Sequence, residues 1–357
     1  MLPRQDLDTE VEWEARWFRV YNRTLVFSDP SLWSSLVFAG QMPAPLQVEL
    51  VEIPEPELPV RDPQGPGQII FQPHLACLCG SDLPFFQGSD EYPIVEGHSL
   101  HEMIGTVVAT NGQRYEVGDL VLAVPLEQRG LYERYVVDET RAIPVDTRVP
   151  GEHALLAQPL GTVLFALKKL PAVVDLDFAV VGQGPIGQLF NLALSNMGAR
   201  QIIGIDLLPS RLAQGLQHGA TATVCNAEVD AVEAVSELTG ARMVDVVIEA
   251  VGHADQAINL CVSLARLGGR MLYFGVPPET IDGVHWRDLF MKNLTVHTSC
   301  NPDFDRDFPL AMQWIGEGRV DVSGLVTHRF PITEIQQAFE LFNSRGDGCL
   351  KVFLDYP

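Results

Sequence analysis

Residues 177–187 read DFAVVGQGPIG, a short apolar run followed directly by a glycine-rich turn. Further short apolar runs follow before residue 300 at intervals of roughly 20–25 residues, and segments of helical periodicity separate them. Strands that alternate with helices in this way are typical of a parallel, doubly wound sheet. We therefore expect an α/β fold with a parallel sheet of six strands, at residues 177–181, 201–206, 221–225, 244–250, 270–275 and 294–299. The helical segment 253–269 is expected to end on Gly268 and Gly269, because glycine commonly closes a helix.

The segments on either side of this region have other patterns. In residues 34–160, Gly and Pro punctuate short strands, which predicts an irregular and mostly antiparallel β domain. Residues 301–357 contain two helical segments, 307–318 and 333–344, and an apolar strand at 349–356. We expect the chain to leave the first domain and return to it, so that 34–160 with 301–357 form one domain and 161–300 the other.

Residues 1–33 form an N-terminal extension. Thr9 and Glu12 have the spacing of a capping box, and an apolar helix face is expected to follow it. Packing of that face on its own chain or on a sister subunit is the favoured interpretation over ligand binding. The residues of the face are Val11, Trp13, Trp17 and Val20.

Composition narrows the function classes. The chain of 357 residues has 24 Lys and Arg against 46 Asp and Glu, a formal net charge of −22. This balance argues against binding to nucleic acid or to anionic membranes, which requires basic surface. No run of 18 apolar residues exists, and the acidic N-terminus does not resemble a signal peptide. The six cysteines form no C-x2-C pair, so neither a disulfide scaffold nor a zinc knuckle is expected. A cytoplasmic enzyme is the default expectation.

The glycine-rich turn predicts a dinucleotide site. Gly182, Gly184 and Gly187 form a G-x-G-x-x-G motif between a strand and a helix that opens with Pro185 and Ile186. In such motifs the glycines allow a tight turn, close approach of the pyrophosphate and close helix packing, and the helix N-terminus attracts the anion. Asp206, at the end of the second strand, can accept hydrogen bonds from the ribose hydroxyls of NAD and would repel the 2′-phosphate of NADP. The guanidinium of Arg211 could instead bind that phosphate, which weakens the discrimination against NADP, but NAD is the favoured cofactor.

A second group of side chains could bind a metal. Cys79 begins the stretch Cys79-Gly-Ser81-Asp82, and His101 and Glu102 follow 22 residues after the cysteine. A thiolate, an imidazole and a carboxylate are zinc ligands, and three protein ligands leave a fourth position open for chemistry. Taken alone, a cysteine is usually a small apolar core residue, and a histidine is more often hydrogen-bonded in a core than bound to a metal. Spacing alone therefore leaves both interpretations open.

Motifs spread in order over about residues 35–355 carry a family resemblance: CGSD, HEMIGTVV, YEVGDLVLAVP, AVVGQGPIGQL, GIDLLPSRL, DVVIEAVG, GGRMLYFGV and LVTHRFPITEIQQAFEL. Together they resemble the medium-chain dehydrogenase/reductase superfamily, in its zinc-type alcohol dehydrogenase family and the sorbitol and threonine dehydrogenase branch. The resemblance implies a GroES-like catalytic domain, a Rossmann domain and a substrate cleft between them. It implies Cys79 and His101 as zinc ligands, Glu102 as a ligand or as a partner of one, and Ser81 as the hydroxyl that passes the substrate proton outward. It also places Gly252 and Val276 at the cofactor.

The sequence departs from the family pattern at three places. The further zinc-linked position, usually Cys or Glu, is Gln158 here, and a neutral amide is a poor zinc ligand. The four-cysteine lobe that binds a structural zinc in many relatives is missing, so one catalytic zinc is expected. Leu83 and Pro84 replace a relay histidine, which makes Glu96 and His98 the candidates for proton transfer.

The leading functional hypothesis is an NAD-dependent, zinc-assisted dehydrogenase of a secondary alcohol, a polyol or a β-hydroxy amino acid, assembled as a homodimer or homotetramer through the edge strand near 294–299. The alternative is a zinc-free reductase of the same fold that reduces an enone or quinone with NADPH. A non-catalytic NAD-binding subunit is a third hypothesis, which Cys79, Ser81 and His101 argue against. Phe85, Phe86 and Trp286 would either line the pocket or pack in the core.

Overall fold

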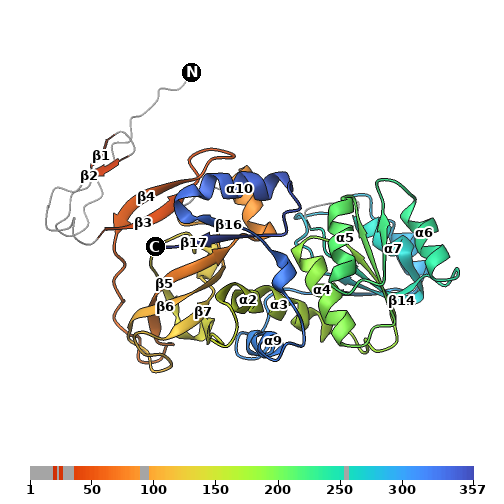
Figure 1. The fold of residues 1–357 in the computed structure, drawn as a ribbon, viewed down its shortest axis with the longest axis horizontal. Helices are drawn as coiled ribbons and strands as arrows, with labels where there is room; N and C mark the ends of the chain where they lie inside the picture. Colours follow the sequence, from red (N-terminus) through yellow and green to blue (C-terminus); the bar gives the residue numbers. More distant parts are fainter. Residues whose placement is uncertain (1–18, 22–23, 27–35, 89–95, 253–256) are drawn as a thin grey trace, which may run out of the picture.

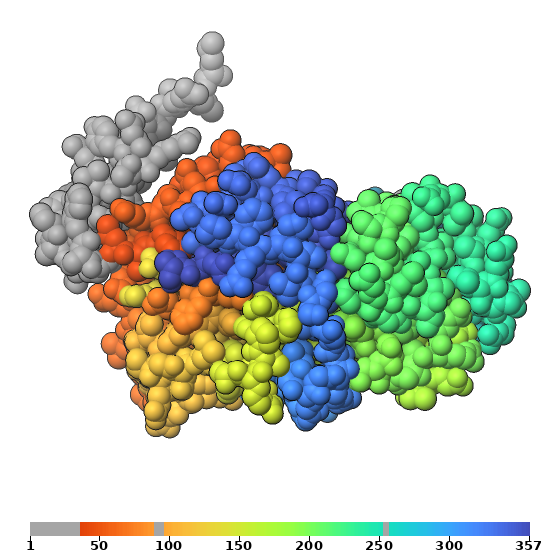
Figure 2. All heavy atoms as spheres, in the orientation of Figure 1, coloured from red at the N-terminus to blue at the C-terminus, as the bar shows by residue number. Residues whose placement is uncertain are grey.

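The computed structural model describes residues 19–21, 24–26, 36–88, 96–252 and 257–357. Two bodies lie side by side in it (Figure 1), one built around a mixed β sheet and the other around a parallel sheet with helices. The first and last parts of the chain share one body, while the middle of the chain forms the other (Figure 2). No helix in these described ranges is long and apolar enough to cross a membrane.

The parallel sheet contains six strands in the order β12-β11-β10-β13-β14-β15. The six runs predicted from the sequence form these strands, with shifted ends at four of them. Their bounds are β10 Asp177–Val181, β11 Gln201–Asp206, β12 Ala222–Cys225, β13 Val244–Glu249, β14 Ala265–Tyr273 and β15 Thr295–Thr298. The helices between them are α4 Pro185–Asn196, α5 Pro209–Gln217, α6 Ala231–Leu238, α7 Ala257–Leu264 and α8 Trp286–Met291. This doubly wound α/β sheet confirms the expected fold class.

The expected end of the helix at Gly268 and Gly269 is wrong. Helix α7 ends at Leu264, and β14 begins at the next residue. The cap comes from a distant side chain, because the ammonium of Lys292 donates hydrogen bonds of 2.8–2.9 Å to the carbonyls of Val262, Ser263 and Ala265. A lysine at a helix C-terminus also interacts favourably with the helix dipole.

The second body confirms the expected β-rich domain. Its sheet has seven strands in the order β16-β17-β5-β6-β7-β9, with β8 paired to β5. All its pairings are antiparallel except the parallel pair β16–β17. The bounds are β5 Gln68–Cys77, β6 Glu102–Thr110, β7 Leu120–Ala123, β8 Tyr135–Asp138, β9 Ala142–Pro144, β16 Val326–Pro331 and β17 Lys351–Asp355. A two-stranded ribbon, β3 Leu36–Gln41 with β4 Glu49–Pro54, lies beside it.

Strand β17, from the last part of the chain, pairs antiparallel with β5. Helix α10, Ile335–Ser344, packs beside β16 and β17 on this body. Helices α2 Gly151–Leu155, α3 Ala157–Leu167 and α9 Asp307–Gly316 lie between the two sheets (Figure 1). Their apolar residues belong to one core cluster that also contains Leu75 of β5 and Phe190 of α4. A continuous core therefore joins the two bodies. The expected domain boundary at 160/161 falls inside α3.

Most of the predicted N-terminal helix lies outside the described residues, including Thr9, Glu12 and both tryptophans of its apolar face. The prediction is wrong for Val20, which belongs to strand β1, Arg19–Tyr21. This strand pairs with β2, Thr24–Val26, in an antiparallel ribbon, in which Val20 lies opposite Leu25. The backbone groups of these strands pair across the ribbon instead of along a helix.

Candidate active site

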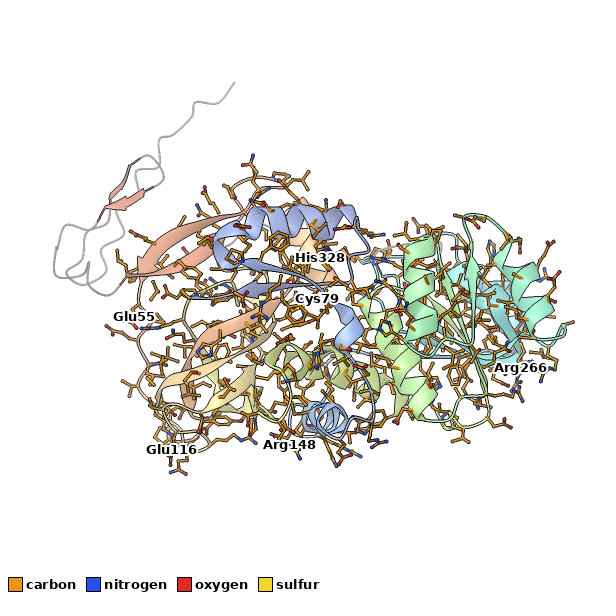
Figure 3. All side chains as sticks on the ribbon, in the orientation of Figure 1. Glu55, Cys79, Glu116, Arg148, Arg266 and His328 are labelled. Atoms are coloured by element: carbon orange, nitrogen blue, oxygen red, sulfur yellow. The ribbon has the colours of Figure 1, made fainter. Side chains whose placement is uncertain are left out.

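The three candidate zinc ligands meet at one end of the β5–β6 pair. Cys77, the last residue of β5, lies opposite Glu102, the first residue of β6. Cys79 follows two residues later as the N-cap of the short 3-10 helix η2, Gly80–Asp82. One donor atom each from Cys79, His101 and Glu102 lies within 4.8 Å of the other two. Figure 3 shows Cys79 near the middle of the molecule, beside the helices that separate the two sheets.

Asp82 is a site residue that the sequence prediction missed. Its buried carboxylate accepts hydrogen bonds from the backbone N–H groups of Cys79, at 2.7 Å, and Leu100, at 2.8 Å. The same carboxylate lies 3.9 Å from Nδ1 of His101. Asp82 therefore ties the turn that carries Cys79 to the segment that carries His101. The signal was present, because the aspartate is the last residue of the quoted CGSD motif.

Lys351 is the second residue that the prediction missed. Strand β17 lies antiparallel to β5, with Phe353 opposite Cys77, and this register brings Lys351 to the end of β5. The ammonium, 1% exposed, donates hydrogen bonds to Oε2 of Glu102, at 2.5 Å, and to the carbonyl of Leu78, at 3.1 Å. A lysine inside an otherwise apolar final strand was the signal, since a buried ammonium requires an acidic partner.

The charges of this group are coupled. Burial raises the pKa of Glu102, and the Lys351 ammonium acts against that shift. Burial lowers the pKa of Lys351, but Cys77, Glu102 and Cys79 more than offset this effect and raise it. Lys351 is therefore a cation at neutral pH. Its charge stabilises acidic side chains that would otherwise repel each other in a buried place.

The donor group fits a zinc ion. Nδ1 of His101 faces the Asp82 carboxylate, and Oε1 of Glu102 is buried without a hydrogen-bond partner among the described residues. Leaving such an atom unsatisfied costs about 1–3 kcal/mol, and a cation would satisfy a free acceptor here. Sulfur, nitrogen and oxygen donors in one small cluster suit zinc better than magnesium or calcium, which prefer oxygen alone.

The remaining predicted residues of the zinc site and of proton transfer lie in different surroundings. The Ser81 hydroxyl in η2 is also buried without a hydrogen-bond partner within the described ranges, and its role in proton transfer stays a prediction. Gln158 is buried in α3. Glu96 is exposed, and the His98 ring lies 4.8 Å from that of Phe85. Their role in proton transfer stays a prediction.

The two remaining aromatic candidates lie in contrasting environments. Phe86 is buried and stacks on Phe339 of α10, with ring centroids 4.9 Å apart, so it packs in the core. Trp286 is 68% exposed at the start of α8.

The glycine-rich turn has the shape that a dinucleotide site needs. Gly182 has φ +93°, and the turn leads directly into α4, whose N-cap is Gly184 and whose first residues are Pro185 and Ile186. A Cβ on Gly187 would lie 1.9 Å from the carbonyl oxygen of Gly182, so only glycine allows the helix this close to the turn. A Cβ on Gly184 would meet no atom nearer than Nη1 of Arg211, at 3.6 Å. The backbone at Gly184 is therefore open to a ligand.

Asp206 lies beside this turn. Its Oδ2 accepts a hydrogen bond from the N–H of Gln183, at 2.7 Å, and its Oδ1 accepts one from Leu208, at 2.9 Å. Nη1 of Arg211 lies 4.0 Å from Oδ2. The two backbone bonds fix the carboxylate and leave each oxygen with a further lone pair for a ribose hydroxyl. Asp206 also partly neutralises Arg211, which weakens the attraction of that guanidinium for a 2′-phosphate.

The loops after β13 and β14 meet on the same side of the sheet. A Cβ on Gly252 would lie 3.2 Å from the backbone nitrogen of Val276, so these two predicted cofactor residues are neighbours. Buried Glu249 joins the loops, because it accepts hydrogen bonds from the N–H groups of Val251, Gly252 and Gly275 at 2.9–3.0 Å. The sequence prediction did not include Glu249.

Comparisons with known proteins agree with this geometry. The model of the alcohol dehydrogenase GroES-like domain matches residues 65–146, and the model of the zinc-binding dehydrogenase domain matches residues 185–317. The L-threonine 3-dehydrogenase of Bacillus subtilis is 28% identical over 85% of this chain and 94% of its own length. The sorbitol dehydrogenase of Ovis aries is 29% identical over 90% of this chain and 95% of its own length.

One solved structure illustrates the shared fold. A short chain alcohol dehydrogenase from Escherichia coli CFT073, complexed with NADH, superposes with a TM-score of 0.78 at 22% identity, covering 90% of this chain and 99% of that one. With both domain models matched in order, the chain belongs to the zinc-type alcohol dehydrogenase family of the medium-chain dehydrogenase/reductase superfamily.

Proposed function

We propose that this protein is a zinc-assisted, NAD-dependent dehydrogenase that transfers a hydride between a secondary alcohol, a polyol or a β-hydroxy amino acid and the nicotinamide. The cluster of Cys79, His101 and Glu102, with donor atoms within 4.8 Å of one another, is the observation that carries the proposal. The substrate classes follow the relatives, which include threonine and sorbitol dehydrogenases.

The residues around the donor cluster would have three roles: binding zinc, holding the ligands in place and accepting the substrate proton. Cys79, His101 and Glu102 would hold the zinc, which when bound supplies a Lewis acid that lowers the pKa of a substrate hydroxyl. Asp82 keeps the cysteine turn and the histidine segment together. Ser81 would accept the hydroxyl proton at its Oγ, which has no other hydrogen-bond partner in the part of the chain that the structure describes.

The cofactor would bind at the other body. Backbone N–H groups at the start of α4 would bind the pyrophosphate, and the helix dipole favours its negative charge. Asp206 would accept the hydrogen bonds of the adenosine ribose. The backbone bonds that already orient its carboxylate support NAD over NADP.

Two observations disfavour the zinc-free enone or quinone reductase. The donor cluster has no role in such an enzyme, yet a buried lysine supports it. Asp206 lies where an NADPH-dependent enzyme would need to accept a phosphate.

The first experiment is a measurement of zinc per chain by elemental analysis, on protein purified without a chelator or a metal-affinity tag. About one zinc per chain, followed by turnover of an alcohol or polyol with NAD, is expected. Protein without zinc that reduces enones or quinones would overturn the proposal. The variant Cys79→Ala, which loses one donor, is the matched control for specific binding.

We propose further that the protein is a homo-oligomer. Strand β15 has β14 as its hydrogen-bonded neighbour and ends the sheet. Beside it, Phe290 and Met291 of α8 are 70% and 61% exposed, and Val296 of β15 is 41% exposed. Burial of such a patch against a second copy would stabilise a dimer. Sedimentation analysis of the native chain and of Phe290→Asp tests this, and the variant is expected to dissociate.

A cytoplasmic location is the last part of the proposal. All six cysteines of the chain are free, as is usual in a reducing compartment. Cell fractionation of the source organism tests it, and recovery with a secreted fraction would contradict it.

A further inference from the structure

A buried polar network lies directly beneath the glycine-rich turn. Gln183, Gln188 and Asn191 are fully buried, and His218 is 5% exposed. Side chains of this polarity are rare in the interior of a parallel sheet domain, and burying them is costly unless each finds a partner. These four come from the turn, from α4 and from the end of α5.

Gln183 is held in a close-fitting space. Its Nε2 donates a hydrogen bond to the carbonyl of Val180, at 3.1 Å, and its Oε1 accepts one from Asn191, at 2.7 Å. A Cβ on Gly204 would lie 2.8 Å from this side chain, and one on Gly215 would lie 2.6 Å from it. The Gln183 side chain therefore fits only because both positions are glycine. The backbone N–H of the same residue binds Asp206.

Gln188 connects this turn to His218. Its Nε2 donates to the carbonyl of Gln183, at 2.8 Å, and to that of Arg211, at 3.0 Å. Both amide hydrogens are therefore used, and its Oε1 can only accept. Since Oε1 lies 3.0 Å from Nδ1 of His218, the imidazole must carry its proton on Nδ1 and donate it.

The opposite side of the imidazole touches the other body. A Cβ on Gly324 would lie 2.3 Å from Nε2 of His218, so the ring packs directly on this glycine. Gly324 belongs to the 3-10 helix η5, Ser323–Leu325, which leads into β16. The charged group that acts on the ring is Asp321, which precedes η5, and His153 of α2 acts on Asp321 in turn.

We propose that His218 is a positioning residue for the dinucleotide: packed on Gly324, its imidazole orients Gln188, and Gln188 in turn fixes the backbone of the Gly182–Gly187 turn. The inference rests on the proposed NAD-binding function. It adds that the geometry of the cofactor turn depends on a contact with the segment of the other body that leads into β16.

Three variants test the chain of contacts. His218→Leu removes the donor to Gln188, His218→Asn keeps an N–H near the position of Nδ1, and Gly324→Ala pushes a methyl group against the ring from the opposite body. The glycine has no left-handed φ, so alanine fits its backbone. Binding of NADH is measured by fluorescence titration, and the KM for NAD and the kcat are measured separately.

We expect His218→Leu and Gly324→Ala each to weaken NADH binding about 3–10-fold, as the loss of one buried hydrogen bond does. The KM for NAD should rise while kcat at saturating NAD stays near the native value. His218→Asn should recover most of the affinity. The double variant His218→Leu/Gly324→Ala should be no weaker than the worse single variant, because both act through one contact.

The control is Thr239→Val, which removes other buried hydrogen bonds of the same body: Oγ1 donates to the carbonyl of Val235 at 2.7 Å and accepts from the N–H of Met243 at 3.0 Å. It should lower the melting temperature without changing NADH affinity. Native affinity in His218→Leu or Gly324→Ala, or equal losses in both variants and the control, would overturn the inference. Absence of NADH binding by the native chain would instead refute the proposed function.

Discussion

The dinucleotide turn and the zinc donor group are assembled in opposite ways. The turn and its acidic partner come from one continuous stretch, Gly182 to Arg211, and most of their contacts are backbone contacts. The donor group comes from the turn after β5 and from the start of β6, and the ion pair of Glu102 with Lys351 of β17 spans 249 residues. A local site can be recognised from spacing, while a site assembled across strands depends on their register.

The largest effect is expected from variants that remove a zinc ligand and leave the cofactor turn unchanged. Cys79→Ala and His101→Ala should each lower the rate of alcohol oxidation by about 1,000-fold or more, since Lewis-acid stabilisation contributes several kcal/mol. NADH affinity should stay nearly native, because the cofactor turn is on the other body. Steady-state kinetics and NADH titration check both points. Loss of NADH binding in either variant would mean that the two sites are not independent.

A second test concerns the long-range ion pair. Lys351→Met should destabilise the protein by about 3–5 kcal/mol, because Glu102 would remain buried without its partner. The double variant Lys351→Met/Glu102→Gln should recover part of this loss, since no charge is then left unpaired. Denaturant unfolding measures both. If the double variant were no more stable than Lys351→Met, the ion pair would not account for the loss.

The local site can be tested at Asp206. Asp206→Ala should weaken NADH binding by about tenfold through the loss of charge-assisted hydrogen bonds, and should reduce discrimination against NADPH. The comparison of the two dissociation constants is the measurement, with Asp230→Ala as a control for the loss of a carboxylate, because Asp230 only caps α6. Unchanged preference would show that the adenosine ribose is held elsewhere.

The smallest expected effect is on the pH dependence of stability. Burial lowers the pKa of His218, and nearby Asp321 acts against this shift. The folded state then binds a proton less readily than the unfolded state, so this contribution is complete above the unfolded pKa and is lost as pH falls towards the folded pKa. Melting temperatures between pH 8 and pH 5 should fall more for the native protein than for His218→Asn. Parallel curves would contradict this expectation.

Some elements of the fold were predictable and others were not. The six apolar runs between residues 177 and 299 predicted the parallel sheet, because its central strands are buried on both faces and are nearly continuous in apolar residues. The end of α7 was not predictable, since its cap is Lys292, from beyond α8. The Gly268–Gly269 pair suggested a local cap, but a distant side chain provided it.

The same distinction holds at the candidate site. The residue types of Cys79, His101 and Glu102 could be read from the sequence, but their convergence could not, because it depends on the pairing of Cys77 with Glu102. Lys351 was missed for the same reason. The apolar sequence of its strand predicts burial, but it does not predict that the strand pairs with β5.

By itself, the sequence determined the alternation of strands and helices, the glycine-rich turn and the kinds of side chain available for chemistry. These depend on backbone preferences and apolar periodicity over a few residues. The tertiary structure alone decided that Lys351 neutralises Glu102, that Asp82 supports the cysteine turn, and that His218 packs on Gly324. Such contacts follow from strand register and from the packing of two bodies on one core, which no short stretch of sequence encodes.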